Sequence, residues 1–140
     1  MKYVPGELKV MAYNEGEKWA EKTVKTTGEA AKLVAEADQL DLASFGEDLS
    51  FITVKVCDEE GNIHPVANNM IEFEIEGPGQ IVATDNGDPA CLTPFPSPKR
   101  MAFNGLVLAI VKAKRGETGT VTLKATSEGL LGTEIQIAVK

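Results

Sequence analysis

The sequence has few of the residue types that build metal sites and redox centres. Among its 140 residues there are two cysteines and one histidine. No Cys-x-x-Cys pair is present, which argues strongly against a zinc site made of cysteine and histidine ligands. For Cys57 and Cys91 we expect two free or buried thiols, although their spacing also allows a disulfide.

Basic residues and long apolar runs are also scarce. Asp and Glu number 21 against 14 Lys and Arg, so the formal net charge is -7. Such an acidic surface repels phosphates, and we expect no nucleic-acid partner. No apolar run approaches membrane-spanning length, so no membrane span is expected. The first residues, Met1–Gly6, contain no apolar signal region, which indicates either a cytoplasmic protein or an internal fragment.

What the sequence does contain is a regular alternation of apolar and polar residues, strongest in its second half. The composition, with 43% apolar and 25% charged residues, is that of one ordinary globular domain. Alternation of period two predicts strands in Leu49–Cys57, Ile71–Glu76, Val121–Thr126 and Ile135–Val139. Because turn residues separate these short strands, the pattern predicts an all-β sandwich or barrel.

The segments between these strands carry further predictions. Asp58–Asn62 has the composition of a hairpin turn, and Gln80–Ala83 of a short strand. Gly105–Lys114 is apolar on both faces, which predicts a central strand buried on both sides. Thr84–Arg100 holds four of the seven prolines and is predicted to be irregular. Irregular segments of this length inside a domain are often functional, or they pack as lids.

The first half of the chain follows a different pattern. Leu8–Ala12 and Lys18–Lys25 alternate on either side of the turn residues Asn14–Glu17, which predicts a lone hairpin. A lone hairpin is at best marginally stable in water, and we expect a domain boundary at Thr26–Gly28. The following segment, Glu29–Leu42, has helical spacing and helix-forming residues, while a strand is the alternative.

Several tracts resemble one known family. Tyr3–Val10 resembles a tract of bacterial glycoside hydrolase family 2 β-galactosidases, at the end of one immunoglobulin-like domain. Asp48–Val54 resembles part of the next domain towards their C-terminus. Four later tracts resemble the same domain in the family's order, and they are Glu76–Gly79, Asp85–Pro89, Arg100–Gly105 and Thr126–Leu130. The resemblance covers nearly the whole chain.

This resemblance implies a specific domain organisation. Residues 28–140 are expected to form an immunoglobulin-like β-sandwich, in an all-β fold. Residues 1–27 are expected to be a hairpin left over from an adjacent domain, namely the terminal hairpin of a preceding immunoglobulin-like domain. The resemblance also favours a strand in Leu33–Leu42, and we prefer it to the helix because tertiary context often overrides propensity.

The resemblance implies a catalytic parent chain but no catalytic residue here. The family hydrolyses β-galactosides with two glutamates held in a TIM barrel, and no barrel fits in this chain. The pair Asn14-Glu15 imitates a family tract, but it falls in a predicted turn and is taken as coincidence. Glu72, Glu74 and Glu76 are predicted to be the solvated face of a strand, and His64 a loop residue.

Two candidate binding features remain. Asp85 and Asp88 flank an Asn-Gly pair, so their oxygens are a candidate calcium site, with a hydrogen-bonded turn as the favoured alternative. No other cofactor is expected. Phe95, between two prolines, is the candidate exposed ring on which a sugar stacks. For Trp19, on the hairpin, packing in a core or between domains is the favoured interpretation.

The function predicted from these observations is a non-catalytic, structural accessory domain of a β-galactosidase-like enzyme of carbohydrate metabolism. The expected partner is the rest of that enzyme, in a secreted, periplasmic or cell-surface location, and residues 1–27 are expected to promote self-association. One alternative is a carbohydrate-binding module that uses Phe95 in the loop Thr84–Arg100. Another is an adhesin-like bacterial immunoglobulin interaction domain.

Overall fold

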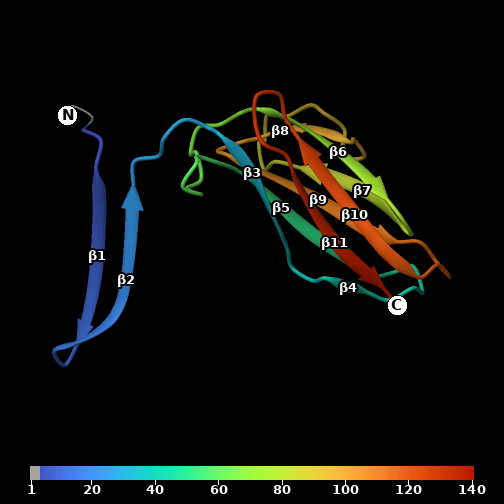
Figure 1. The fold of residues 1–140 in the computed structure, drawn as a ribbon, viewed down its shortest axis with the longest axis horizontal. Coiled ribbons are helices and arrows are strands. Elements are labelled where there is room, and N and C mark those ends of the chain that lie inside the picture. Colours follow the sequence, from blue (N-terminus) through green and yellow to red (C-terminus); the bar gives the residue numbers. More distant parts are fainter. Residues whose placement is uncertain (1–3) are drawn as a thin grey trace.

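The computed structural model describes residues 4–140, and this part of the chain is built from strands and their connections (Figure 1). Residues 1–3, which begin the predicted hairpin segment 1–27, lie outside the described residues. From residue 4 onwards no helix is long and apolar enough to cross a membrane. The strands are β1 (Glu7–Asn14), β2 (Glu17–Lys25), β3 (Lys32–Ala37), β4 (Asp41–Leu42), β5 (Leu49–Cys57), β6 (Met70–Glu76), β7 (Gly79–Asp85), β8 (Lys99–Met101), β9 (Leu106–Ala113), β10 (Gly119–Thr126) and β11 (Thr133–Val139).

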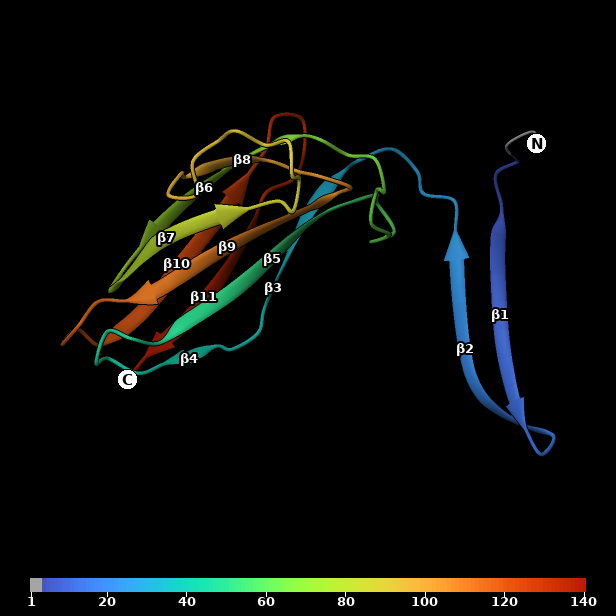
Figure 2. The same cartoon turned by 180° about the vertical axis from the view of Figure 1, so that it is seen from behind.

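Strands β3 to β11 form two sheets that pack face to face (Figures 1 and 2). One sheet has the order β4-β11-β10-β6-β8 and the other the order β3-β5-β9-β7. Neighbouring strands are antiparallel, except that β4 runs parallel to β11 with Leu42 opposite Val139. Two antiparallel sheets around one core confirm the predicted immunoglobulin-like β-sandwich.

The core lies between the two sheets, where every second residue of each strand points inward. The alternation that predicts the strands therefore also selects the core, because successive side chains leave a strand on opposite faces. The buried apolar residues include Leu33, Leu42, Ile52, Val54, Val56, Ile71, Phe73, Val107, Val111, Val121, Leu123, Ile137 and Val139. The outward residues Glu72, Glu74 and Glu76 of β6 are exposed, as predicted.

The connection from β5 to β6 corrects one prediction. Asp58–Asn62 does turn the chain, with the Asp58 N–H donating to the Asn62 carbonyl at 2.9 Å. One antiparallel bridge, Cys57 to Ile63, follows this turn, but β5 and β6 belong to different sheets, so the turn does not join them as a hairpin. Turn residues specify a local reversal of the chain, whereas the choice of partner strand depends on the whole core.

Three other predictions are also corrected. The helix indicated by residue spacing in Glu29–Leu42 is wrong, and the strand favoured by the family resemblance is confirmed by β3 and β4. Strand β9 is central, between β5 and β7, but only one of its faces is fully buried, and Leu106 is 38% exposed. The irregular segment predicted for Thr84–Arg100 is shorter than expected, since β7 ends at Asp85 and β8 begins at Lys99.

Strands β1 and β2 form a separate two-stranded sheet that stands away from the sandwich (Figures 1 and 2). One face of this hairpin is mostly apolar, and its residues are Leu8, Val10, Ala12, Ala20 and Val24, with Lys22 opposite Val10. The other face is mixed, because Met11 and Tyr13 alternate there with Lys9 and are exposed, while Lys9 and Lys18 both form ion pairs with Glu21. The hairpin is therefore amphipathic, with one mostly apolar face and its ion pairs on the other.

The carboxylate of Asp58 joins the end of the hairpin segment to the sandwich. Its Oδ2 atom accepts the N–H of Gly28 at 3.0 Å, and its Oδ1 atom accepts the N–H of Asn62 at 2.8 Å. Burial raises the pKa of Asp58, but these hydrogen bonds and that of the Glu60 N–H outweigh it and lower the pKa to about 2. An ionised carboxylate thus orders the junction.

Candidate functional site

The most elaborate polar structure in the sandwich is built around the buried side chain of Arg100. Arg100 lies in β8, opposite Ile71 of β6, and it is 1% exposed. Its neighbours Lys99 and Met101 point outward, so the alternation of β8 directs the guanidinium inward. The group faces the segment 86–98, which connects β7 to β8.

The Arg100 guanidinium forms five hydrogen bonds, two with Thr84 of β7 and three with this segment. Nε donates to Thr84 Oγ1 at 3.2 Å, and Nη2 donates to the carbonyls of Thr84 and Pro94 at 2.6 and 2.8 Å. Nη1 donates to the Thr93 carbonyl at 2.8 Å and to Cys91 Sγ at 3.3 Å. These acceptors are carbonyl, hydroxyl and thiol groups, so several neutral dipoles, and no carboxylate among them, solvate the buried cation.

The same contact changes the acidity of Cys91. A hydrogen bond from the Thr93 N–H, followed by the hydrogen bond from Arg100, lowers the pKa of Cys91 below the usual thiol value. Desolvation instead raises the pKa of Cys57, which is fully buried. Both cysteines are free thiols, but only Cys91 is partly accessible.

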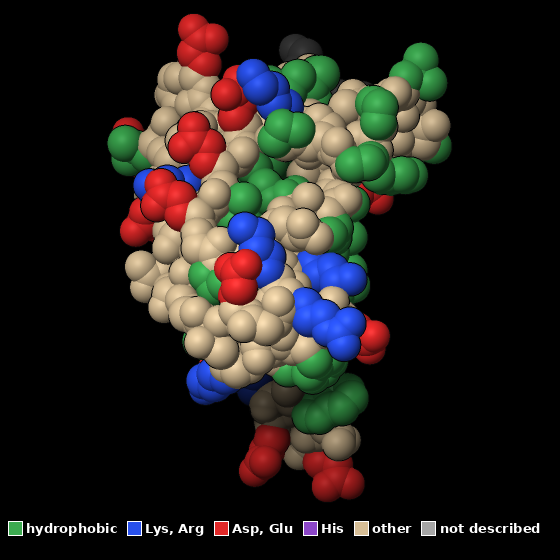
Figure 3. All heavy atoms as spheres, turned by 90° about the vertical axis from the view of Figure 1, so that its right-hand side faces the viewer, with side chains coloured by type: hydrophobic (Ala, Val, Ile, Leu, Met, Phe, Trp, Pro, Cys, Tyr) green, Lys and Arg blue, Asp and Glu red, His purple; other side chains and the backbone are tan. Residues whose placement is uncertain are grey.

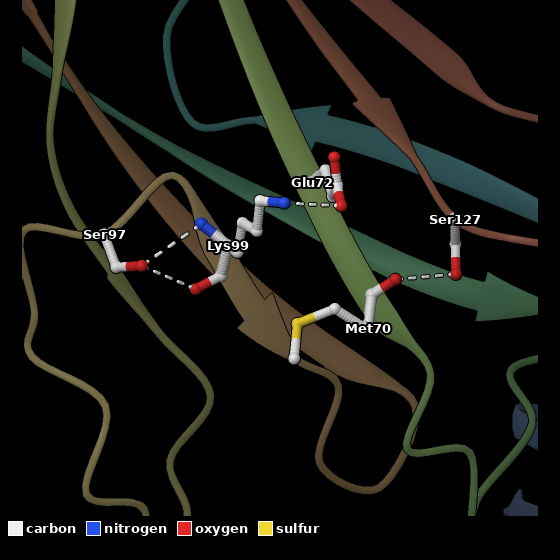
Figure 4. A network of polar contacts seen from close by, with 5 residues as sticks. All are labelled: Met70, Glu72, Ser97, Lys99 and Ser127. Atoms are coloured by element: carbon white, nitrogen blue, oxygen red, sulfur yellow. Dashed lines mark hydrogen bonds and ion pairs between the residues drawn. The ribbon is translucent and has the colours of Figure 1, made fainter.

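Polar side chains fix the point where this segment enters β8, and others tie β6 to its surroundings. Figure 4 shows that the Ser97 hydroxyl donates to the Lys99 carbonyl at 2.9 Å and accepts the Lys99 N–H. The Lys99 ammonium pairs with Glu72 of β6 at 2.8 Å. On the opposite side of β6, the Ser127 hydroxyl donates to the Met70 carbonyl at 2.8 Å. Strand β8 is thus tied to β6 by side chains as well as by its short ladder.

The predicted ligand ring, Phe95, is 61% exposed at the tip of the segment. Its ring centroid lies 6.0 Å from the Arg100 guanidinium carbon, at the outer limit of a cation–π contact. The Phe95 carbonyl accepts the N–H of Thr84 at 2.7 Å, which fixes the backbone of this residue. A role of Phe95 in sugar binding stays a prediction.

The two candidate calcium ligands lie in consecutive turns. Asp85 Oδ1 accepts the N–H groups of Asn86 and Gly87, and Asp88 Oδ1 accepts that of Ala90. These bonds are those of hydrogen-bonded turns, the alternative favoured by the sequence. Among residues 4–140, no group of three or more His, Cys, Asp or Glu side chains is arranged to hold a metal ion. Calcium binding at Asp85 and Asp88 stays a prediction.

A groove that Phe95 does not line adjoins this segment. Its walls come from residues 66–68 before β6, residues 86–93 after β7 and residues 101–104 before β9, and its volume is about 530 Å³. Cys91 and Asp88 line it, together with the amides of Asn68, Asn86 and Asn104. The groove therefore combines polar groups that are far apart in the sequence.

A comparison with known families identifies the chain. The family described as glycoside hydrolase family 2 C-terminal domain 5 matches residues 33–136, from β3 to β11. The chain belongs to this family. Its sequence is 39% identical to a β-galactosidase of Bacteroides ovatus over 140 residues, which is all of this chain and 16% of that protein.

Solved structures of glycoside-cleaving proteins have the same fold. A glycosyl hydrolase family 2 member from Bacteroides cellulosilyticus matches with a TM-score of 0.92 and 28% identity, over 100% of this chain and 18% of that chain. A β-glycosidase from Bacteroides vulgatus matches with a TM-score of 0.94 and 21% identity, over 98% of this chain and 18% of that chain, and supports the fold alone. The family resemblance stated from the sequence tracts is confirmed, and the chain spans less than a fifth of these proteins.

Sequence reasoning missed the central residue of the site in this family 2 domain. Arginine is rarely buried, so a sequence gives no reason to place Arg100 inside. The alternation of β8 could have indicated that Arg100 points inward, but a strand of three residues is too short to show a clear alternation. Asn68 and Asn104 were missed because each belongs to a connection whose course depends on the sheets.

Proposed function

We propose that this chain is a non-catalytic accessory region of a larger β-galactoside-hydrolysing enzyme. The observation that carries this proposal is the amphipathic hairpin, whose apolar face is left without a cover by the rest of residues 4–140. In a larger chain, this face would complete the core of a preceding domain. The span of 16% of the Bacteroides ovatus β-galactosidase supports a position within a longer protein.

The hairpin needs such a cover for its own stability. Val10 in β1 is 59% exposed, and Leu8 and Val24 on the same face are also exposed. Burying one aliphatic side chain of this size contributes about 1.5–3 kcal/mol, whereas an isolated two-stranded hairpin is marginal in water. The opposite face carries the ion pair of Lys9 with Glu21 together with the exposed Met11 and Tyr13, so it is the more polar of the two faces.

A second apolar surface supports packing of the sandwich against other parts of the enzyme. On the outer face of the sheet β3-β5-β9-β7, Phe51 lies opposite Ile110, and Thr53 lies opposite Leu108. Phe51 and Leu106 are exposed, while Leu108 and Ile110 are half-buried. Figure 3 shows another side of the molecule, where hydrophobic side chains gather in the upper right and acidic ones on the left. Apolar surfaces of this kind are typical of interdomain contacts.

A chimera tests the proposal. The chain replaces the matching 140 residues of the Bacteroides ovatus β-galactosidase. Val10→Ser, on the apolar face, is compared with Lys9→Ser, on the opposite face, in the chimera and in the isolated chain at low concentration. Val10→Ser should lower the unfolding free energy by about 1–3 kcal/mol in the chimera and by much less in the isolated chain. Lys9→Ser should have a small effect in both.

Two results would contradict this function. One is an equal effect of Val10→Ser in the chimera and in the isolated chain, which would mean that no neighbouring domain covers the face. The other is hydrolysis of nitrophenyl β-galactoside by the isolated chain at a rate comparable to that of the chimera.

The uncovered hairpin also leads to a prediction for the isolated chain. The outer edges of β1 and β2 have no neighbouring strand within residues 4–140, and unpaired edges promote association between chains. Sedimentation velocity should show concentration-dependent self-association that disappears when residues 1–27 are deleted. A strictly monomeric chain would contradict it.

A further inference from the structure

The groove between residues 66–68, 86–93 and 101–104 has the size and the walls of a small-molecule site. Its volume of about 530 Å³ lies within the roughly 300–1,000 Å³ that ligand pockets span. None of its lining residues belongs to the hairpin that carries the proposed accessory role, so it is a separate feature of the sandwich.

Amide groups dominate the polar lining of the groove. Within the described residues 4–140, the side chains of Asn68 and Asn104 form no hydrogen bond with protein groups, and both are exposed. Asn86 is held in place, since its Nδ2 donates to the Met101 carbonyl at 2.9 Å and its Oδ1 accepts the Asp88 N–H at 3.0 Å. Each free amide offers both donors and an acceptor, which matches hydroxyl groups that donate and accept.

The charge of the lining restricts the class of ligand. Among the lining residues, all of which are described, Asp88 is the one with a charged side chain. The nearby Arg100 guanidinium is directed into carbonyl groups of the segment 86–98 and is 1% exposed. A groove with a carboxylate and no accessible cation disfavours phosphates, sulfates and uronic acids. It therefore suits a neutral ligand rich in hydroxyl groups.

Apolar side chains complete the lining. Phe103, which is 37% exposed, and the exposed Leu92 and Val66 lie beside the amides. Pyranose rings have C–H faces that pack on aromatic and aliphatic surfaces, while their hydroxyl groups bind polar side chains. The alternation of amide and apolar groups in one groove fits this amphipathic character.

The walls are fixed before any ligand arrives. Arg100 holds residues 91–94, and residues 103–106 form a two-residue hairpin in which Asn104 and Gly105 both have positive φ. This turn conformation suits an Asn-Gly pair. Because the backbone around the groove is already ordered, little conformational entropy is lost on binding.

We propose that this groove binds a neutral saccharide, by hydrogen bonds with the amides of Asn68 and Asn104, by hydroxyl donation to the Asp88 carboxylate and by packing of a sugar face on Phe103. The inference rests on the proposed function in one respect, the choice of β-galactosides as the first probes. The Asn and Asp side chains of the groove play no part in the hairpin contact.

The test uses Cys91, which lines the groove and has an acidic thiol, as a reporter of occupancy. The complete chain is treated with iodoacetamide in the presence of lactose, a β-1,4-galactan oligosaccharide or galacturonic acid, and alkylation is followed by mass spectrometry. At ten times the dissociation constant of a bound saccharide, alkylation of Cys91 should slow about ten-fold, because about a tenth of the sites stay free. The buried Cys57 serves as the internal reference for unfolding.

Matched variants locate the effect. Asn68→Ala and Asn104→Gly each remove a free amide, and glycine keeps the positive φ that the turn requires. Each substitution should raise the dissociation constant of the saccharide, measured by protection of Cys91 from alkylation, about five-fold. This is the effect expected for the loss of one hydrogen bond. Asn69→Ala changes the neighbouring asparagine, which does not line the groove, and should leave protection unchanged.

Three results would overturn the inference. They are the absence of saturable protection by both neutral saccharides, equal protection by galacturonic acid, and protection that Asn68→Ala and Asn104→Gly leave unchanged. The Val10 comparison in the chimera is independent of all three, so failure of the saccharide site and failure of the accessory role give different results.

Discussion

Replacing Arg100 with methionine tests whether the buried guanidinium holds the β7–β8 connection in place. Methionine has a similar length and no charge, so it fills much of the space but forms none of the five hydrogen bonds. The Thr84 carbonyl, in a fully buried residue, loses a partner at 2.6 Å. The carbonyls of Thr93 and Pro94 lie in exposed residues, where water can replace the arginine.

The expected loss of stability follows from this difference in exposure. One buried carbonyl left without its partner costs about 1–3 kcal/mol, and the imperfect fit of methionine adds to this cost. Removal of the buried charge offsets part of this cost, because its desolvation no longer opposes folding. We therefore expect Arg100→Met to lower the unfolding free energy by about 2–4 kcal/mol, less than five independent hydrogen bonds would give.

This change in unfolding free energy is measured by urea unfolding, followed by far-ultraviolet circular dichroism. Arg115→Met is the matched control, because Arg115 is exposed in the turn between β9 and β10 and the substitution removes the same charge. An Arg100→Met effect within about 0.5 kcal/mol of the control would refute the reasoning. The same variant should also raise the pKa of Cys91, because the thiolate loses its hydrogen bond from the guanidinium.

Three further tests concern the turns and the thiols. In urea unfolding, Gly105→Ala should destabilise the fold by about 1–3 kcal/mol more than Gly116→Ala. Both glycines have φ near 78°, but only at Gly105 would a Cβ lie 2.3 Å from a carbonyl oxygen, that of His64. The pKa of Asp58 is lowered to about 2, so its carboxylate should stabilise the fold above about pH 4 and less as the pH falls towards 2. The urea midpoint of Asp58→Asn should vary less over that range, and an equal variation would contradict the junction contact. Iodoacetamide should modify Cys91 at lower pH and faster than Cys57, and equal rates would contradict their different environments.

The strands were the most predictable part of the molecule. In Leu49–Cys57 the inward residues Ile52, Val54 and Val56 are apolar and lie in the core, and Ser50 is the buried polar residue on the same face. The hairpin over residues 7–25 was equally clear, because alternation and turn residues act over a few neighbouring positions. The β3 segment was harder, since Leu33, Ala35 and Ala37 are good helix formers that pairing with β5 holds in a strand.

The candidate site was much less predictable. Phe95, Asp85 and Asp88 were chosen because exposed rings and carboxylates suggest ligands, but the groove lies beside Asn68 and Asn104 instead, with Asp88 as the shared residue. Arg100 gave no signal, because its burial depends on five acceptors supplied by residues 84–94. Local patterns do not encode such a convergence.

The sequence by itself determined the strands, the amphipathic hairpin and, through ordered tracts, the family. These features depend on residues that are neighbours along the chain or on motifs that can be read directly. Only the tertiary structure decided that β5 and β6 lie in different sheets, that one face of β9 is partly open, and that Arg100 is buried. The physical reason is that pairing, burial and the groove each arise from contacts between segments distant in sequence, selected together by the packing of one shared core.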